Sequence, residues 1–155
     1  MAELNLENGG LEIERAIVEN GEIVCCTSGV SMYPMLRNRR DMVVISKLDR
    51  KLKKYDVPLY RMPSGKLLLH RIIKITDKGY VIRGDNRFNN EYNITDNMII
   101  GVLKAFYREG KFYDCETHKG YKLYIRLNRY TFYIRKLWSL AIRPVLGKIK
   151  RAIFK

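Results

Sequence analysis

The order of apolar and polar residues predicts one short helix followed by a series of strands. Apolar residues near helical spacing predict an amphipathic helix over Leu11–Asn20, which ends at the Asn20–Gly21 turn signal. Short apolar and β-branched runs separated by turn residues then predict strands. The predicted strands are Glu22–Thr27, Met42–Ser46, Asp56–Arg61, Lys66–Ile75, Tyr80–Arg83, Ile99–Tyr107 and Lys111–Tyr113. We therefore expect a mostly β body.

The period changes again near the C-terminus. From Tyr121 onward, apolar residues recur every three or four positions, with Arg and Lys at other angles, which predicts a basic amphipathic helix. The apolar series is Tyr130, Ile134, Leu137, Ala141 and Val145. Pro144 and Gly147 are expected to bend or interrupt this helix. We predict a body of residues 1–118 and a tail of residues 119–155.

Charge separates the same two parts. The 155-residue chain has 30 Lys and Arg, 16 Asp and Glu, and a net charge of +14. The last acidic residue is Glu116, and 11 of the bases follow it, so the body is close to neutral. A basic tail of this kind is expected to meet an acidic surface, either phospholipid headgroups or nucleic acid.

The compartment is inferred from three features. Acidic residues stand near the N-terminus, where a signal peptide would have a basic segment. No apolar stretch approaches the roughly 18 residues of a spanning helix. Cys25, Cys26 and Cys115 match neither a disulfide framework nor a metal-binding pair. We expect a cytoplasmic protein with no signal peptide, no transmembrane segment, no cofactor and no metal. Peripheral binding at the inner membrane face is compatible with this expectation.

Three short segments carry the candidate chemistry. They are Ser28–Leu36 (SGVSMYPML), Leu69–Ile72 (LHRI) and Arg83–Asn86 (RGDN). In this order they resemble the signal peptidase I family, where a Ser-Met-x-Pro-x-Leu segment bears the nucleophile and Gly-Asp-Asn follows. The resemblance covers about half the chain. It implies the β-fold shared with self-cleaving SOS-repressor peptidases, and a serine endopeptidase of the type whose base is the histidine of a His-Arg-Val/Ile segment.

Ser31 is the predicted nucleophile and His70 its general base. A serine hydroxyl needs a base beside it, and imidazole, with an ordinary pKa of about 6.5, accepts a proton near neutral pH. A strand histidine alone would more often be a structural residue, but the serine loop favours the catalytic reading. His118 lies in a Thr-His-Lys-Gly turn and is expected at the surface. A lysine base is a minor alternative, offered by Lys66, Lys74 and Lys78.

The resemblance also assigns roles within the serine loop. It implies that Met32 packs near the substrate groove and that Pro34 fixes the loop. The backbone N–H of Ser31, helped by Ser28 or Gly29, would stabilise the oxyanion of the tetrahedral intermediate.

The acid that orients the imidazole is left open between two residues. Asp85, in the Gly-Asp-Asn segment, is the first choice. Histidine-type relatives also use an acidic residue several positions beyond that segment, and the stretch Asn86–Tyr92 offers only Glu91 there.

Two other classes of function compete with a peptidase acting on a peptide or protein precursor in trans. The tail aromatics among Arg and Lys would suit a nucleic-acid-binding module, but no helix-turn-helix or zinc pattern occurs, so nucleic acid is the less favoured partner. An anionic membrane surface explains the apolar and basic tail better. The body could also be an inactive or self-processing fragment, although only about 30 residues precede Ser31.

Overall fold

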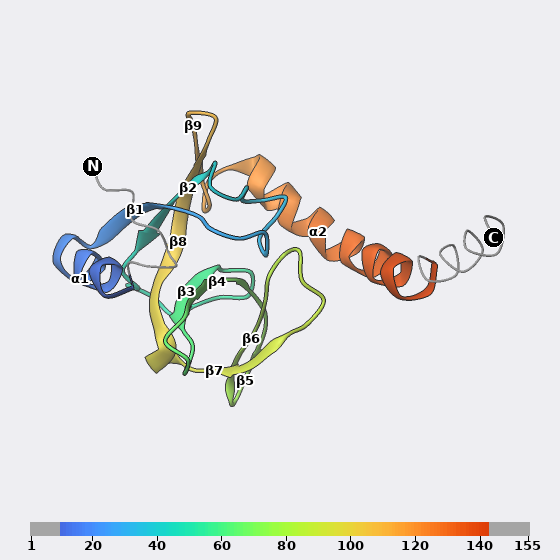
Figure 1. Cartoon of the computed structure of the whole chain (residues 1–155), viewed down its shortest axis with the longest axis horizontal. Helices are drawn as coiled ribbons and strands as arrows, with labels where there is room; N and C mark the ends of the chain where they lie inside the picture. The colour runs from blue at the N-terminus through green and yellow to red at the C-terminus, as the bar shows by residue number, and fades with distance from the viewer. Residues whose placement is uncertain (1–9, 143–155) are drawn as a thin grey trace, which may run out of the picture. The chain divides into compact units, whose positions relative to one another are not determined.

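The computed structural model describes residues 10–142, which form a mostly β body and a helix near the C-terminus (Figure 1). Contacts divide the chain into residues 1–119 and 120–155, one position beyond the predicted boundary. The helices and strands are α1 (Gly10–Asn20), β1 (Glu22–Cys26), β2 (Met42–Ser46), β3 (Pro58–Arg61), β4 (Leu67–Leu69), β5 (Arg71–Thr76), β6 (Gly79–Arg83), β7 (Glu91–Ile94), β8 (Ile99–Arg108), β9 (Lys111–Asp114), α2 (Lys119–Leu137) and the π-helical turn Trp138–Ile142, with a 3-10 turn at Asp96–Met98. The predicted fold class, a mostly β body with a short helix before it and a helix after it, is confirmed.

The strands form two antiparallel sheets. The larger has the order β1-β2-β8-β3-β4, with β9 paired to β8, and the smaller has the order β5-β6-β7. Strand β8 is the longest of the described strands and pairs with β2, β3 and β9, so it is the central strand of the larger sheet. The smaller sheet places a polar strand, β7, beside β6.

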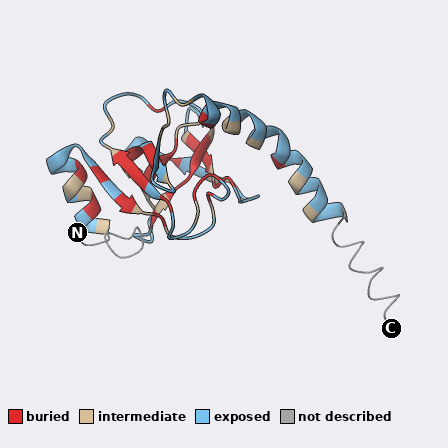
Figure 2. Cartoon of the chain, turned by 90° about the horizontal axis from the view of Figure 1, so that it is seen from above, coloured by how far each residue is buried: buried red, intermediate tan, exposed pale blue. Residues whose placement is uncertain are grey.

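Helix α1 packs on the larger sheet through its apolar stripe. Ile13 and Ile17, one turn apart, are the buried residues of the helix. The helix approaches β8 closely at Gly101, where an added Cβ would lie 3.4 Å from Ile17 Cδ1 and 2.7 Å from the backbone oxygen of Ser46. Figure 2 shows the buried residues concentrated in the strands and on one side of this helix.

One apolar cluster includes residues of both sheets. Its buried members are Leu52, Tyr60, Ile72, Tyr80, Ile82, Ile94 and Val102. Each large apolar side chain removed from water contributes about 1.5–3 kcal/mol. The cluster therefore holds the two sheets together.

The predicted strand Lys66–Ile75 is wrong in one respect, because it is two strands. Leu67–Leu69 pairs with β3 in the larger sheet, whereas Arg71–Thr76 pairs with β6 in the smaller sheet. His70 is the residue between them, so the chain passes from one sheet to the other at this histidine.

The helix predicted from Tyr121 is present as α2, which begins at Lys119. Val145, Pro144 and Gly147, with the predicted bend, lie outside the described residues. Across residues 10–142, no helix has both the length and the apolar character needed to cross a membrane.

Candidate active site

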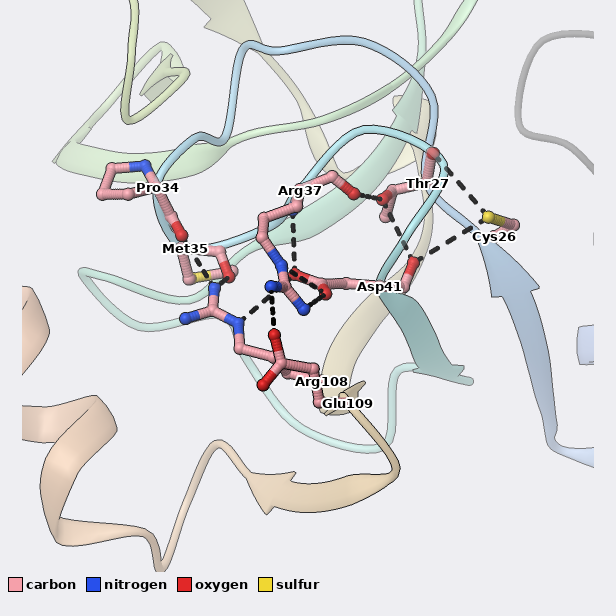
Figure 3. Close-up of polar contacts among 8 residues, drawn as sticks. All are labelled: Cys26, Thr27, Pro34, Met35, Arg37, Asp41, Arg108 and Glu109. Atoms are coloured by element: carbon pink, nitrogen blue, oxygen red, sulfur yellow. Dashed lines mark hydrogen bonds and ion pairs between the residues drawn. The ribbon is translucent and has the colours of Figure 1, made fainter.

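Ser31 lies in the long loop between β1 and β2, and the base of this loop is fixed by Asp41. The Asp41 side chain is completely buried and accepts three hydrogen bonds from Arg37, from its backbone N–H (2.9 Å), Nε (2.9 Å) and Nη2 (2.8 Å). Thr27 Oγ1 donates to the backbone oxygen of Asp41 (3.2 Å), which closes the loop (Figure 3). Charge-assisted bonds to a buried carboxylate are among the stronger polar interactions in proteins.

The far side of the loop is tied to β8 through Arg108. Its Nη2 donates to the backbone oxygens of Pro34 (2.7 Å) and Met35, as Figure 3 shows. Its Nε lies 3.4 Å from Asp41 Oδ2. The loop is therefore held from the sheet as well as at its base.

A small pocket opens beside the serine. Its lining residues come from the serine loop and from the end of β4: Thr27, Ser28, Gly29, Ser31, Met32, Leu36 and Leu69. Four of the predicted site residues, Ser28, Gly29, Ser31 and Met32, thus meet in one pocket. Leu69 is the residue directly before His70, so the pocket joins the serine loop to the histidine segment.

The predicted roles of the loop residues are distinguished by their contacts. Met32 is buried, whereas Pro34 is exposed and does not line the pocket. Gly29 has a φ of +89°, a conformation that favours glycine, and its N–H donates to Asn38 Oδ1 (2.8 Å). That N–H is therefore already used, which leaves Ser28 as the predicted helper for an oxyanion.

The Gly-Asp-Asn segment packs directly against the serine. The backbone N–H of Asn86 donates to the backbone oxygen of Ser31 (2.7 Å), and Asn86 Nδ2 donates to that of Val30 (3.2 Å). A Cβ at Gly84 would lie 2.7 Å from the Ser31 oxygen and 3.1 Å from the Ser31 Cβ. Glycine is required here because any side chain would displace the serine loop.

His70 is buried, and its Nδ1 lies between two oxygen atoms. Tyr60 Oη is 3.1 Å from Nδ1, and Glu91 Oε2 is 3.3 Å from it. Tyr60 also donates a hydrogen bond to Glu91, so the three side chains form a closed triangle. Tyr60 was not predicted from the sequence, where it reads as an ordinary aromatic strand residue.

Two members of the triangle, Glu91 and Tyr60, have shifted pKa values. Burial alone would raise the pKa of Glu91, but the hydrogen bonds from His70 and Tyr60 outweigh it, so its pKa lies below the ordinary value. Burial and the hydrogen bond to Glu91 raise the pKa of Tyr60 far above that of a free phenol. At neutral pH the triangle therefore contains a carboxylate and a protonated phenol.

Asp85, the first choice of orienting acid, forms an ion pair with Arg71. It accepts hydrogen bonds from Arg71 Nε (2.8 Å) and Nη2 (2.7 Å), and both side chains are almost completely buried. Arg71 also reaches Met35 Sδ (2.8 Å) and the backbone oxygen of Tyr55 (3.0 Å). The carboxylate at His70 Nδ1 is that of Glu91, the alternative acid, whereas the Asp85–Arg71 pair joins the Gly-Asp-Asn segment to the histidine segment.

The remaining candidates for base and nucleophile are less suitable. Lys66, Lys74 and Lys78 are all exposed. His118 is half-buried with its ring against Tyr113, the two ring centroids 4.9 Å apart. Burial and the neighbouring Cys26 raise the pKa of Cys25 to about 12, so this thiol stays protonated. Within the described residues, no group of His, Cys, Asp and Glu is arranged to hold a metal ion.

Comparison of the sequence with models of protein families and with curated proteins finds no match. The resemblance to signal peptidase I therefore depends on the three short segments alone. The contacts that join those segments are independent of the resemblance.

Proposed function

We propose that this protein is a serine endopeptidase of the signal peptidase I type. Ser31 is the nucleophile, His70 the general base and Glu91 the acid that orients the imidazole. One observation carries the proposal: Ser31 lines a pocket whose other wall ends at Leu69, next to a buried histidine whose Nδ1 faces a carboxylate. A serine, a histidine and a carboxylate are the nucleophile, base and orienting group that acyl transfer uses, so their presence around this pocket supports the proposal.

In the proposed reaction, Ser31 Oγ attacks the carbonyl carbon of the scissile peptide bond while His70 Nε2 accepts the hydroxyl proton. Glu91 stabilises the imidazolium that forms. The Ser31 N–H, with the Ser28 hydroxyl, donates to the oxyanion. The imidazolium then protonates the leaving amine, and water hydrolyses the acyl-enzyme with His70 again as base.

The proposed substrate is a peptide or protein precursor cleaved in trans. Val30 and Tyr33, on either side of the serine, expose about half of their side-chain surface. These apolar groups beside the pocket favour an extended substrate with apolar residues near the scissile bond.

Labelling with a fluorophosphonate probe tests the proposal. The wild-type chain is expected to be labelled at Ser31, and Ser31→Ala is expected to abolish labelling because no hydroxyl remains to attack phosphorus. Ser64→Ala, which changes an exposed serine in a turn, is the matched control and should label like the wild type. Equal labelling of Ser31→Ala and wild type, or no labelling of either, would contradict the proposal.

We propose a second function for the protein, the attachment of α2 to an anionic membrane surface. Five apolar residues at spacings of three and four form an exposed stripe on this helix: Leu123, Leu127, Tyr130, Ile134 and Leu137. Lys122, Arg126, Arg129 and Lys136 are also exposed, and no acidic residue follows Glu116. An apolar stripe beside basic residues matches the boundary between acyl chains and anionic headgroups. Nucleic acid stays the less favoured partner, because the stripe would be left in water.

The full-length chain is expected to co-sediment with vesicles containing phosphatidylserine and to detach as salt rises, because surface charges are screened over about 8–10 Å at physiological ionic strength. Leu127→Gln combined with Ile134→Gln should weaken binding at least about tenfold, since each buried apolar side chain contributes about 1.5–3 kcal/mol. Thr131→Gln, at an exposed polar position of the same helix, is the control. Equal binding of all three proteins, or binding to RNA in place of vesicles, would rule out the membrane role.

A further inference from the structure

Tyr60 is a buried residue that contacts His70 but has no role in the proposed reaction. Its side chain is fully buried in the cluster that joins the sheets, on β3 of the larger sheet. Its hydroxyl nevertheless contacts two polar groups, His70 Nδ1 and the Glu91 carboxylate. Glu91 belongs to β7 of the smaller sheet. The histidine between the sheets is therefore held by one side chain from each of them.

The protons of this triangle can be assigned from donor capacity. Tyr60 has one hydroxyl proton, and an ionised carboxylate can only accept. The Tyr60 hydroxyl donates to Glu91, which leaves it no proton for His70. Nδ1 of His70 consequently faces two oxygens that both act as acceptors toward it. A lone pair on Nδ1 would find no donor there, whereas an N–H on Nδ1 is satisfied by either oxygen.

We propose that Tyr60 is a positioning residue that, together with Glu91, holds the neutral imidazole of His70 as the Nδ1–H tautomer. This form leaves the lone pair on Nε2. An imidazole side chain in water favours the opposite Nε2–H form, so the buried triangle reverses the ordinary preference. The catalytic importance of this tautomer rests on the proposed function, because only Nε2 is then basic toward the Ser31 hydroxyl. The tautomer itself does not depend on any activity.

Tyr60 acts through Glu91 as well as on the ring. By donating to the carboxylate, its hydroxyl fixes the oxygen that accepts from Nδ1. In Tyr60→Phe the aromatic ring still fills the core, but the carboxylate loses this donor and the ring nitrogen loses one of its two acceptors. We expect the imidazole to adopt a mixture of tautomers and orientations in this variant.

Tyr80 provides a matched control in the same core. It belongs to the same apolar cluster, and its hydroxyl donates to Asp96 Oδ1 (2.6 Å). Tyr80→Phe thus removes a tyrosine–carboxylate hydrogen bond of the same kind at a site with no contact to the His70 triangle among the described bonds. An effect of Tyr60→Phe that Tyr80→Phe lacks cannot be attributed to a general loss of core stability.

The test is nitrogen NMR of the full chain with ¹⁵N-labelled histidine, at a pH where the imidazole is neutral. The chain has two histidines, so His118→Asn assigns the signals. The wild type and Tyr80→Phe are expected to show His70 as Nδ1–H, and Tyr60→Phe a mixture with Nε2–H. Nε2–H in the wild type would overturn the proposal, as would Tyr60→Phe spectra that match those of Tyr80→Phe. If Tyr60→Phe does not fold, Glu91→Ala takes its place in the comparison with the wild type, with the same mixture of tautomers expected.

Peptide cleavage gives a second measurement. Tyr60→Phe should lower kcat about 10-fold to 100-fold, a part of the contribution of a positioned base, with KM within about twofold. Tyr80→Phe should leave kcat unchanged. Tyr60→Phe should add little to the loss in Glu91→Gln, because both act through the same ring. The two proposals can fail separately. If His70 is the Nδ1–H tautomer but Ser31→Ala and the wild type label equally, the positioning by Tyr60 is supported and the peptidase is rejected.

Discussion

His70→Ala is expected to lower kcat/KM for peptide cleavage by about 10⁴-fold, the loss typical of a disabled serine triad. His70 is buried and directly follows Leu69 of the serine pocket, and in the proposed mechanism it is the group that accepts the proton of the Ser31 hydroxyl. The fold should survive, because alanine removes the ring from a junction that other residues hold together. The measurement is steady-state hydrolysis of a peptide, with circular dichroism to verify folding.

Lys74→Ala is the control for that experiment. Lys74 lies on β5 four residues beyond His70, but its side chain is exposed. An ammonium group has only donors and no lone pair with which to accept a proton. We expect this variant to keep most of the wild-type activity. The opposite pattern, with His70→Ala active and Lys74→Ala inactive, would identify a lysine peptidase.

Asp85→Ala is expected to destabilise the body by about 3–5 kcal/mol, the usual cost of removing one partner from a buried ion pair. The side chains of Arg71 and Asp85 expose only 4% and 2% of their surface. Without the carboxylate, the guanidinium is left buried and uncompensated. The measurement is the free energy of unfolding in urea.

Two further variants separate charge burial from general damage. Arg71→Met combined with Asp85→Leu removes both charges and should be less destabilised than Asp85→Ala alone. Glu22→Gln breaks the Lys104–Glu22 pair, whose side chains are about half exposed, and should cost less than about 1 kcal/mol. A loss below 1 kcal/mol in Asp85→Ala would show that the pair does not hold the Gly-Asp-Asn segment to the histidine segment.

Much of the fold could be predicted because its signals are local. The β-branched run at β2 and the spacing of Ile13 and Ile17 depend on neighbouring residues, and both elements are present. The break at His70 could not be predicted, since Leu67–Thr76 reads as one apolar run until its two halves pair with different strands. Strand β7 was missed because its residues are mostly polar and exposed.

The candidate site could be predicted in its segments but not in its contacts. The motif spacing selected Ser31, His70 and the Gly-Asp-Asn segment. This segment meets the serine loop partly through a close backbone approach that Gly84 permits. Which carboxylate meets the imidazole depends on where Arg71 points, and no local pattern encodes this direction. Tyr60 has no sequence signal of its own, because its hydroxyl finds its partners only after two sheets have met.

The passage of the chain from one sheet to the other at His70 has a consequence during synthesis. Tyr60 comes from β3, His70 from the β4–β5 junction and Glu91 from β7, so no single hairpin contains the triangle. A chain that has folded only its first strands has the serine loop but lacks the group that orients the base. Under the proposed mechanism, hydrolysis therefore requires a fold that is complete through β7, so activity would appear only after synthesis has passed Glu91.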